Sequence, residues 1–333
     1  MSLSRQRARE LLARFPTCTV AVVGDLMLDR FLYGSVERIS PEAPVPIVRV
    51  EDECRMPGGA GNVVCNIRAL KGRASVCGWV GADAEGRELI RLLRSRGADA
   101  GAVRAVRGGR TVVKTRVIAE RQQVVRVDWD EAPAPAPDDA RAFRSALAPV
   151  IQSSDGLILE DYGKGFLTQP LVNAALRAAR SASIPVGLDP KSNGLTFRGL
   201  RIATPNRREA FEAAGREDPG AGTAPLRDRP LVQVGAALRE KWGCDHLLVT
   251  LGPRGMLLLE QGKRPVHVPT CAREVFDVSG AGDTVIAACL LALAAGAEVR
   301  EAAELANAAA GVVVGKIGTA TCTPDELLLT VSS

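Results

Sequence analysis

The hydrophobic residues of this chain fall into short apolar runs separated by stretches with helical spacing. Strand-like runs are predicted at 19–23, 157–159, 185–188, 201–203 and 247–250. Helical patterns lie between the later runs, at 170–182, 206–214 and 232–242. Strands that alternate with helices are typical of parallel βαβ units, and continuous apolar strands indicate burial on both faces of the sheet. The pattern therefore predicts an α/β fold, a doubly wound α/β/α sandwich.

Two segments depart from that alternation and predict a second, smaller sheet. Residues 34–57 contain a proline-rich stretch and the strand-like run 47–50, while residues 110–129 read as two alternating strands. We expect a small antiparallel sheet that serves either as a lid over an active site or as a dimerisation surface. Residues 131–139, EAPAPAPDD, predict a short extended linker. The whole chain, 1–333, is expected to form one domain that carries these lid segments.

Composition excludes some classes of protein. Hydrophobic residues make up 46% and charged residues 24% of the 333 positions, as in ordinary globular proteins. The net charge is +5, but no basic stripe interleaved with aromatic residues indicates nucleic-acid binding. The apolar run 285–297 is too short to span a bilayer, and no signal peptide is recognised. The eight cysteines form no CxxC pair, so a zinc site is not expected. Their distribution fits a reducing compartment best. We expect a cytoplasmic protein that binds neither nucleic acid nor membrane.

The segment 277–284, DVSGAGDT, carries the clearest chemistry, because an apolar helix is predicted directly after it. Gly280, Ala281 and Gly282 let backbone N–H groups approach an anion, and the positive end of the helix adds to the attraction. Asp283 lies beside them, where a carboxylate accepts the proton of an attacking hydroxyl while the amides stabilise a transferring phosphoryl group. The alternative is a glycine-rich turn in which Asp283 only caps the helix. The segment matches neither a P-loop nor the GxGxxG fingerprint of dehydrogenases.

Residues 277–288 resemble the C-terminal signature of the ribokinase (PfkB) carbohydrate kinases, and the segment 58–62, GGAGN, resembles their N-terminal sugar-binding signature. Val64 departs from that signature, where a small residue is usual. Residues 204–206 and 250–255 are also similar, so the resemblance covers nearly the whole chain. It implies a ribokinase-like fold with a β-sheet lid, ATP and Mg²⁺ as cofactors, and phosphoryl transfer to an alcohol group with Asp283 as the catalytic base.

Further segments resemble one subfamily, the D-glycero-β-D-manno-heptose 7-phosphate kinases of lipopolysaccharide core synthesis: 23–29, 38–46, 160–165, 189–191 and 314–321. This similarity implies transfer of the ATP γ-phosphoryl group to the anomeric hydroxyl, giving the 1,7-bisphosphate. Ser192-Asn193 stands where Gly-Thr is usual. Many such kinases are fused to a nucleotidyltransferase domain with an HxGH motif, which neither histidine of this chain forms, so a stand-alone kinase is expected. Another sugar or nucleoside kinase, or a non-catalytic sugar-binding sensor, is the alternative.

The resemblance also implies the residues that contact the sugar phosphate. Asp29 follows the first strand, where doubly wound sheets bind ligands, although a surface-loop role is the alternative. The expected sugar contacts are Asp29, Gly58, Gly59 and Asn62. Basic side chains are candidates for the substrate phosphate, against the alternative that they are only solvated. They are Lys164, Lys191, Lys114 and Arg116, with Arg121 and Arg126 nearby.

On the nucleotide side, the segment 206–209 resembles the family's Asn-x-x-Glu motif. The resemblance implies that Asn206, Arg207, Arg208 and Glu209 contact the ATP phosphates and that Glu209 holds magnesium through water. A helix N-cap is the alternative, and both roles are compatible. Residues expected to line the phosphates, ribose and adenine are Thr250, Gly252, Gly255 and Asn307. The lid additionally predicts a homodimer in which paired lids cover each other's apolar faces.

Overall fold

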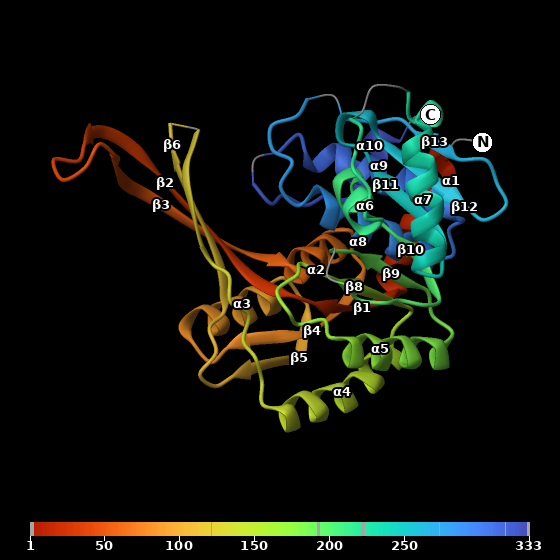
Figure 1. The fold of residues 1–333 in the computed structure, drawn as a ribbon, viewed down its shortest axis with the longest axis horizontal. Coiled ribbons are helices and arrows are strands. Elements are labelled where there is room, and N and C mark those ends of the chain that lie inside the picture. Colours follow the sequence, from red (N-terminus) through yellow and green to blue (C-terminus); the bar gives the residue numbers. More distant parts are fainter. Residues whose placement is uncertain are drawn as a thin grey trace.

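A nine-stranded sheet forms the centre of the described part of the chain, with the order β13-β12-β11-β10-β9-β8-β1-β4-β5 (Figure 1). This computed structural model describes residues 3–120, 122–191, 194–220, 224–272, 274–316 and 318–331. From β11 through β5 neighbouring strands are parallel, whereas β12 and β13 are antiparallel additions at one edge. The strands are β1 (Thr19–Gly24), β4 (Arg73–Gly81), β5 (Asp99–Val106), β8 (Gly156–Glu160), β9 (Val186–Asp189), β10 (Leu200–Ala203), β11 (Cys244–Thr250), β12 (Met256–Glu260) and β13 (Val266–Val268).

Helices cover both faces of this sheet, and each face has its own buried apolar cluster. One face packs against α1 (Arg5–Arg14), α2 (Ala60–Ala69), α3 (Ala84–Ser95), α8 (Ala281–Ala294), α9 (Val299–Val313) and α10 (Pro324–Thr330). The other packs against α4 (Pro137–Gln152), α5 (Gln169–Ala182), α6 (Arg207–Ala213) and α7 (Arg229–Lys241). The predicted doubly wound α/β/α sandwich is therefore confirmed. Within the described ranges, no helix combines the length and apolarity that crossing a membrane requires.

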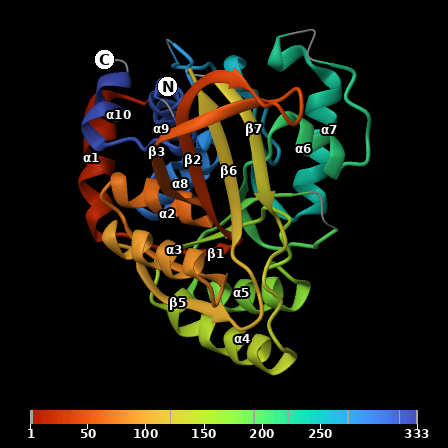
Figure 2. The same ribbon diagram turned by 90° about the vertical axis from the view of Figure 1, so that its left-hand side faces the viewer.

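Four further strands form a separate sheet that projects from the body, in the order β3-β2-β6-β7 (Figures 1 and 2). They are β2 (Leu26–Ile39), β3 (Pro46–Gly59), β6 (Val112–Ala119) and β7 (Gln122–Trp129). Strands β2 and β3 pair from Leu26 and Gly59 at the body to Ile39 and Pro46 at the tip. We call this sheet the lid.

Three expectations about the lid and its surroundings need correction. The first lid segment begins at Leu26 rather than at residue 34, because β2 leaves the body almost directly after β1. The lid is mixed rather than antiparallel, since its two central strands, β2 and β6, run parallel. The predicted linker 131–139 is shorter, because Pro137, Asp138 and Asp139 form the first turn of α4, where proline and acidic residues are favoured.

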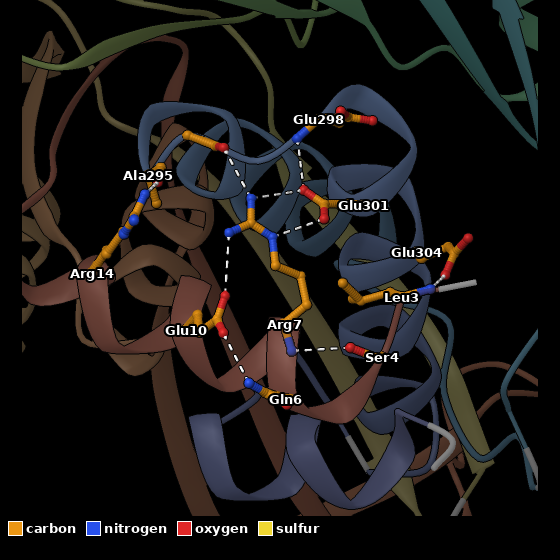
Figure 3. A network of polar contacts seen from close by, with 11 residues as sticks. Leu3, Ser4, Gln6, Arg7, Glu10, Arg14, Ala295, Glu298, Glu301 and Glu304 are labelled. Atoms are coloured by element: carbon orange, nitrogen blue, oxygen red, sulfur yellow. Dashed lines mark hydrogen bonds and ion pairs between the residues drawn. The ribbon is translucent and has the colours of Figure 1, made fainter. Parts of the chain in front are cut away.

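The N-terminal helix α1 is tied to α9 by polar contacts at its edge (Figure 3). The guanidinium group of Arg7 donates to Glu301 at 2.8 Å, and the backbone N–H of Leu3 donates to Glu304 at 2.5 Å. Arg14 donates to the carbonyl oxygen of Ala295, just after α8, at 3.3 Å. The contacts to Glu301 and Glu304 fix α9, the helix that carries Asn307, and the contact to Ala295 fixes the end of α8.

Candidate active site

Asp283, the expected base, lies in the first turn of α8 and is only 3% exposed. One of its carboxylate oxygens accepts a hydrogen bond from the side-chain amide of Asn62 at 2.6 Å, and the other accepts one from the hydroxyl of Tyr162 at 2.7 Å. Asn62 comes from α2 and Tyr162 from the loop after β8. The two donors therefore fix the orientation of the carboxylate from two different elements.

Burial raises the pKa of Asp283 to about 6, although the hydrogen bonds from Asn62 and Tyr162 act in the opposite direction. The nearby carboxylate of Asp29 raises this pKa further, and the ammonium group of Lys114 lowers it. A base works best when its pKa lies near the operating pH, because it is then both ionised and basic enough to take a proton. The surroundings of Asp283 thus suit proton abstraction from a hydroxyl group.

The loop before Asp283 presents backbone N–H groups at the start of α8. Gly280 is the N-cap of the helix and has a φ of 76°, in the left-handed region that favours glycine. The N–H groups of Gly282 and Asp283 have no hydrogen-bond partner among the described residues, as expected for a first helical turn. The N–H of Ala281, however, donates to the carbonyl oxygen of Val278 at 3.2 Å. The anion-binding donors are therefore fewer than the sequence suggested.

Asp25 organises the residues around the base, and the sequence analysis did not single it out. Its buried carboxylate accepts hydrogen bonds from the backbone N–H groups of Tyr162 (2.8 Å), Lys164 (3.2 Å) and Phe166 (3.1 Å). Its carbonyl oxygen accepts from the N–H of Ala60, at the start of α2, at 3.0 Å. Asp25 therefore fixes both elements that supply hydrogen bonds to the base. The available signal was its position, since it follows a buried strand at the edge where parallel sheets bind ligands.

The expected sugar-binding residues meet where the lid joins the body. Asp29 is 5% exposed and pairs with Arg116 at 2.5 Å. It lies within strand β2, so the expectation of a loop position after the first strand is wrong. A Cβ atom at Gly58 would lie 2.3 Å from a carboxylate oxygen of Asp29, so the neighbouring strand needs glycine there. Gly59 follows as the N-cap of α2, the helix that carries Asn62.

The expected phosphate-binding lysines lie around Tyr162. Lys114 has its ammonium nitrogen 5.3 Å from the centre of the Tyr162 ring, and that of Lys191 is 6.0 Å away. Lys191 also pairs with Glu209 at 2.6 Å, whereas Lys164 pairs with Asp130, directly after β7. Arg126 instead pairs with Asp128 on the exposed lid, and Arg121 and the Ser192-Asn193 departure lie outside the described residues.

A cavity of about 420 Å³ lies beside the loop that precedes Asp283 and is lined by four of the eight expected nucleotide residues; those of the segment 206–209 do not line it. Its lining includes Thr250, Gly252, Gly255 and Asn307, together with Ala281 and Gly282. The side-chain amide of Asn307 donates to the carbonyl oxygen of Pro269 at 2.7 Å. This cavity is mainly apolar and extends to the start of α8. Its shape suits a nucleotide whose phosphates point towards Asp283.

The segment 206–209 forms a capping box at the start of α6, the alternative considered for it. Arg207 is held by Asp218 and Asp228, both at 2.6 Å, and the exposed Arg208 pairs with Glu212, so both guanidinium groups have protein partners in this structure. Glu209 uses one oxygen for Lys191 and the other for the N–H of Asn206. This fits contact with a metal through water better than direct coordination.

Comparison with known proteins identifies the family that this chain resembles. A model of the pfkB family carbohydrate kinases matches residues 18–326. Bifunctional protein HldE of Pelobacter propionicus is 42% identical over 328 residues, 98% of this chain and 66% of that protein. The protein of the same name from Gluconacetobacter diazotrophicus is 44% identical over 316 residues, 94% of this chain and 64% of that protein. The chain thus spans slightly less than two thirds of the length of these relatives.

Solved structures show the same architecture. Ribokinase of Arabidopsis thaliana, complexed with ribose and ATP, aligns with a TM-score of 0.71 at 20% identity, covering 95% of this chain and 99% of that one. The tetrameric inhibited form of phosphofructokinase-2 from Escherichia coli aligns with a TM-score of 0.73 at 19% identity, covering 94% and 98%. The expected ribokinase-like fold is confirmed. Because the family model matches most of its length, the chain belongs to the pfkB family of carbohydrate kinases.

Proposed function

We propose that the chain phosphorylates the anomeric hydroxyl of D-glycero-β-D-manno-heptose 7-phosphate, giving the 1,7-bisphosphate for ADP-heptose and lipopolysaccharide core synthesis. The observation that best supports phosphoryl transfer is the buried carboxylate of Asp283. Two donors fix its orientation, and it lies beside backbone N–H groups at the start of α8 that have no partner among the described residues. The choice of substrate is supported by the segments that resemble heptose 7-phosphate kinases and by the 42–44% identity to HldE proteins.

Each part of the site has a role in this reaction. ATP would supply the phosphoryl group, and its Mg²⁺ would neutralise phosphate charge, with Glu209 contacting the metal through water. Asp283 takes the proton of the anomeric hydroxyl, while Asn62 and Tyr162 hold its two oxygens in place. The N–H groups of Gly282 and Asp283 stabilise negative charge on the transferring group.

The positive residues around Tyr162 suit a substrate that carries its own phosphate. In this proposal Asp29 binds sugar hydroxyls at the base of the lid. Lys114, Arg116, Lys164 and Lys191 surround the same space from the lid and from two strand ends. Several of them pair with carboxylates, and a phosphate dianion would compete for these cations. A neutral sugar gains nothing from them.

We expect heptose 7-phosphate to be preferred over fructose, ribose and adenosine by at least about 100-fold in kcat/KM. The reason is that basic side chains which bind the substrate phosphate discriminate strongly against substrates that lack it. A coupled ADP-release assay with these four acceptors measures the preference. Equal turnover of an unphosphorylated acceptor would refute the heptose assignment, and ligand binding without any ADP release would favour a sugar-binding sensor.

We also propose that two chains pair through their lids. Val125, Val127 and Trp129 alternate along β7, so they share one face of the lid, and they are 47–54% exposed. In the register with β6, Val127 lies opposite Thr115, which places Lys114 and Arg116 on the other face, towards the site. An exposed apolar sheet face of this kind is typical of a surface that packs against another protein chain. A tetrameric form is known for phosphofructokinase-2 from Escherichia coli.

Val125→Lys is expected to convert a dimer into a monomer, because it places a charge in the middle of this face. Sedimentation equilibrium measures the change. Leu226→Lys is the matched control, since Leu226 is 54% exposed on the body and lies outside the lid. A wild-type chain that sediments as a monomer, or a Val125→Lys variant that still dimerises, rules out this contact.

Use of ATP and the free state of all eight cysteines support a cytoplasmic location.

We further propose that the body and the lid act together as one kinase domain.

A further inference from the structure

Two buried polar side chains, Asn66 and Thr284, connect α2 to α8 beside the proposed base. Asn66 lies on α2, four residues after Asn62, and Thr284 follows Asp283 on α8. Both side chains are completely buried where the two helices pack together. Residues four apart share one face of a helix, so Asn62 and Asn66 face α8 together. A leucine in place of Asn66 would need no hydrogen bonds, so a buried amide at this position requires an explanation.

Asn66 uses both its oxygen and its nitrogen within this interface. Its side-chain oxygen accepts a hydrogen bond from the hydroxyl of Thr284 at 2.9 Å. Its side-chain nitrogen donates to the backbone carbonyl oxygen of Asn62 at 3.0 Å and to the side-chain oxygen of Asn62 at 3.4 Å. Asn62 in turn donates to the carboxylate of Asp283 at 2.6 Å. The four residues therefore form one chain of hydrogen bonds that begins at Thr284 and ends on the base.

Each amide in this chain has one orientation that satisfies its neighbours. The nitrogen of Asn66 must face Asn62, because a backbone carbonyl oxygen can only accept. The side-chain oxygen of Asn62 is then the second acceptor for Asn66, which turns the Asn62 nitrogen towards Asp283. In the opposite orientation of Asn62, two nitrogens would face each other and an oxygen would face the carboxylate. Asn66 thus favours the orientation in which Asn62 donates to the base.

Gly280, the N-cap of α8, lies on the other side of the same amide. A Cβ atom at Gly280 would lie 2.5 Å from the side-chain nitrogen of Asn62, so the amide is in close contact with the loop. The carbonyl oxygen of Gly280 also lies 3.0 Å from the hydroxyl of Thr284. Thr284 therefore links the start of α8 to the amides that reach the base.

We propose that Asn66 and Thr284 are positioning residues for the phosphoryl transfer, because they hold the Asn62 amide in the orientation that donates to Asp283. They act through Asn62 and not by contact with a substrate. This inference rests on the proposed role of Asp283 as the base. It implies that the two residues affect how fast bound substrates react, and not how tightly they bind.

Asn66→Leu tests the middle of the chain, because it removes donor and acceptor and keeps a similar size. We expect kcat to fall by about tenfold, since Asn62 no longer holds the base in place, while each KM changes by less than about threefold. Ile67→Val is the matched control, since Ile67 is the next residue of α2 and also completely buried, but the change removes only packing. It should keep the wild-type kcat. ADP release measures both variants, and circular dichroism shows whether they fold.

The pH profile is a readout that a purely structural role would not change. The hydrogen bond from Asn62 lowers the pKa of Asp283, against the effect of burial. Weakening this bond raises that pKa, so the acid limb of kcat/KM in Asn66→Leu should move to higher pH by at least about half a unit. In Ile67→Val the limb should stay in place.

The other ionisable groups that face Asp283 are the same in both variants, so a shift is assigned to Asn62. They come from the lid, from β8 and the loop after it, and from β9: Asp29, Lys114, Glu160, Tyr162 and Asp189.

Thr284→Val and Thr284→Ser test the other end of the chain and decide the matter if Asn66→Leu does not fold. Valine has the shape of threonine without the hydroxyl, so the oxygen of Asn66 loses its donor and kcat should fall by roughly threefold to tenfold. Serine keeps the hydroxyl and should restore most of this loss. Equal kcat values for the two variants overturn the proposal.

A folded Asn66→Leu variant with the wild-type kcat and an unshifted acid limb also overturns it. Asp283→Asn separates this failure from failure of the proposed function. An active Asp283→Asn variant removes the base itself, whereas an inactive one beside a fully active Asn66→Leu variant removes only the chain that begins at Thr284.

Discussion

Asp283→Asn is expected to lower kcat by about 10²–10⁴-fold, because the variant loses the group that takes the proton of the attacking hydroxyl. Asparagine has nearly the same size and can still accept one hydrogen bond, from Asn62 or from Tyr162. Replacing a buried carboxyl by a neutral amide also removes a desolvation cost, so the fold should persist. ADP release measures kcat, and calorimetry measures ATP binding.

Retained ATP binding is what distinguishes loss of the base from loss of the fold. The nucleotide cavity is lined mainly by residues outside this contact, including Thr250, Gly255 and Asn307. We therefore expect the Kd for ATP to change by less than about threefold. If the variant keeps more than a tenth of the wild-type kcat, another group takes the proton and the assignment of Asp283 as base is wrong.

Gly280→Ala is expected to lower kcat/KM by about 100-fold, since it disturbs the base without altering it. A Cβ atom at this position would lie 2.5 Å from the side-chain nitrogen of Asn62, the donor that holds Asp283. Asn62 must move away, and displacement of a catalytic group by about 1 Å can cost this much. The φ of 76° adds a backbone cost of about 1–2 kcal/mol for any residue with a Cβ. Steady-state kinetics and urea unfolding measure the two effects.

Gly262→Ala separates these effects. Gly262 also has a positive φ, 68°, but a Cβ there meets nothing within 4 Å, and it lies in the turn after β12. This control should lose similar stability and keep its activity. Equal activities in the two variants would show that the contact between Gly280 and Asn62 does not position the base.

The sequence predicted the class of the body and five of its nine strands, because these strands are short and buried and most are separated by clear helical patterns; β4, β5, β12 and β13 were not among the expected strands. β1 and β8 to β11 appear within a few residues of their expected positions. Strand β2 was not recognised, because Asp29, Arg30 and Glu37 interrupt its apolar residues and its pairing partner lies beyond a proline-rich turn. The parallel pairing of β2 with β6 joins segments about 85 residues apart, which local periodicity does not encode.

The site was predictable in part. Asp283, Asn62 and the glycine loop have recognisable motifs, and the structure brings them together. Tyr162 was quoted only as part of a matching segment, because its importance comes from its hydrogen bond to Asp283, which approaches from another element. The partners of Arg207, Asp218 and Asp228, lie beyond its helix and no local pattern reveals them. Arg208, by contrast, pairs with Glu212 four residues later in α6, a spacing that is readable from the sequence.

Strands β2 and β3 stay paired along their whole length, with register shifts at Tyr33/Gly34 and Val36/Arg38, so a movement of the tip of the lid is transmitted towards the body. Strand β2 has 14 residues, about 45 Å of extended chain, and Asp29 is the fourth of them, close to the pivot at the body. A paired ribbon that swings as one piece through about 4 Å at Ile39 shifts Asp29 by roughly 1 Å, a distance that matters for reaction rate. In the role proposed for Asp29, a contact at the far end of the lid would therefore adjust the position of the sugar by about a quarter of the movement at the tip.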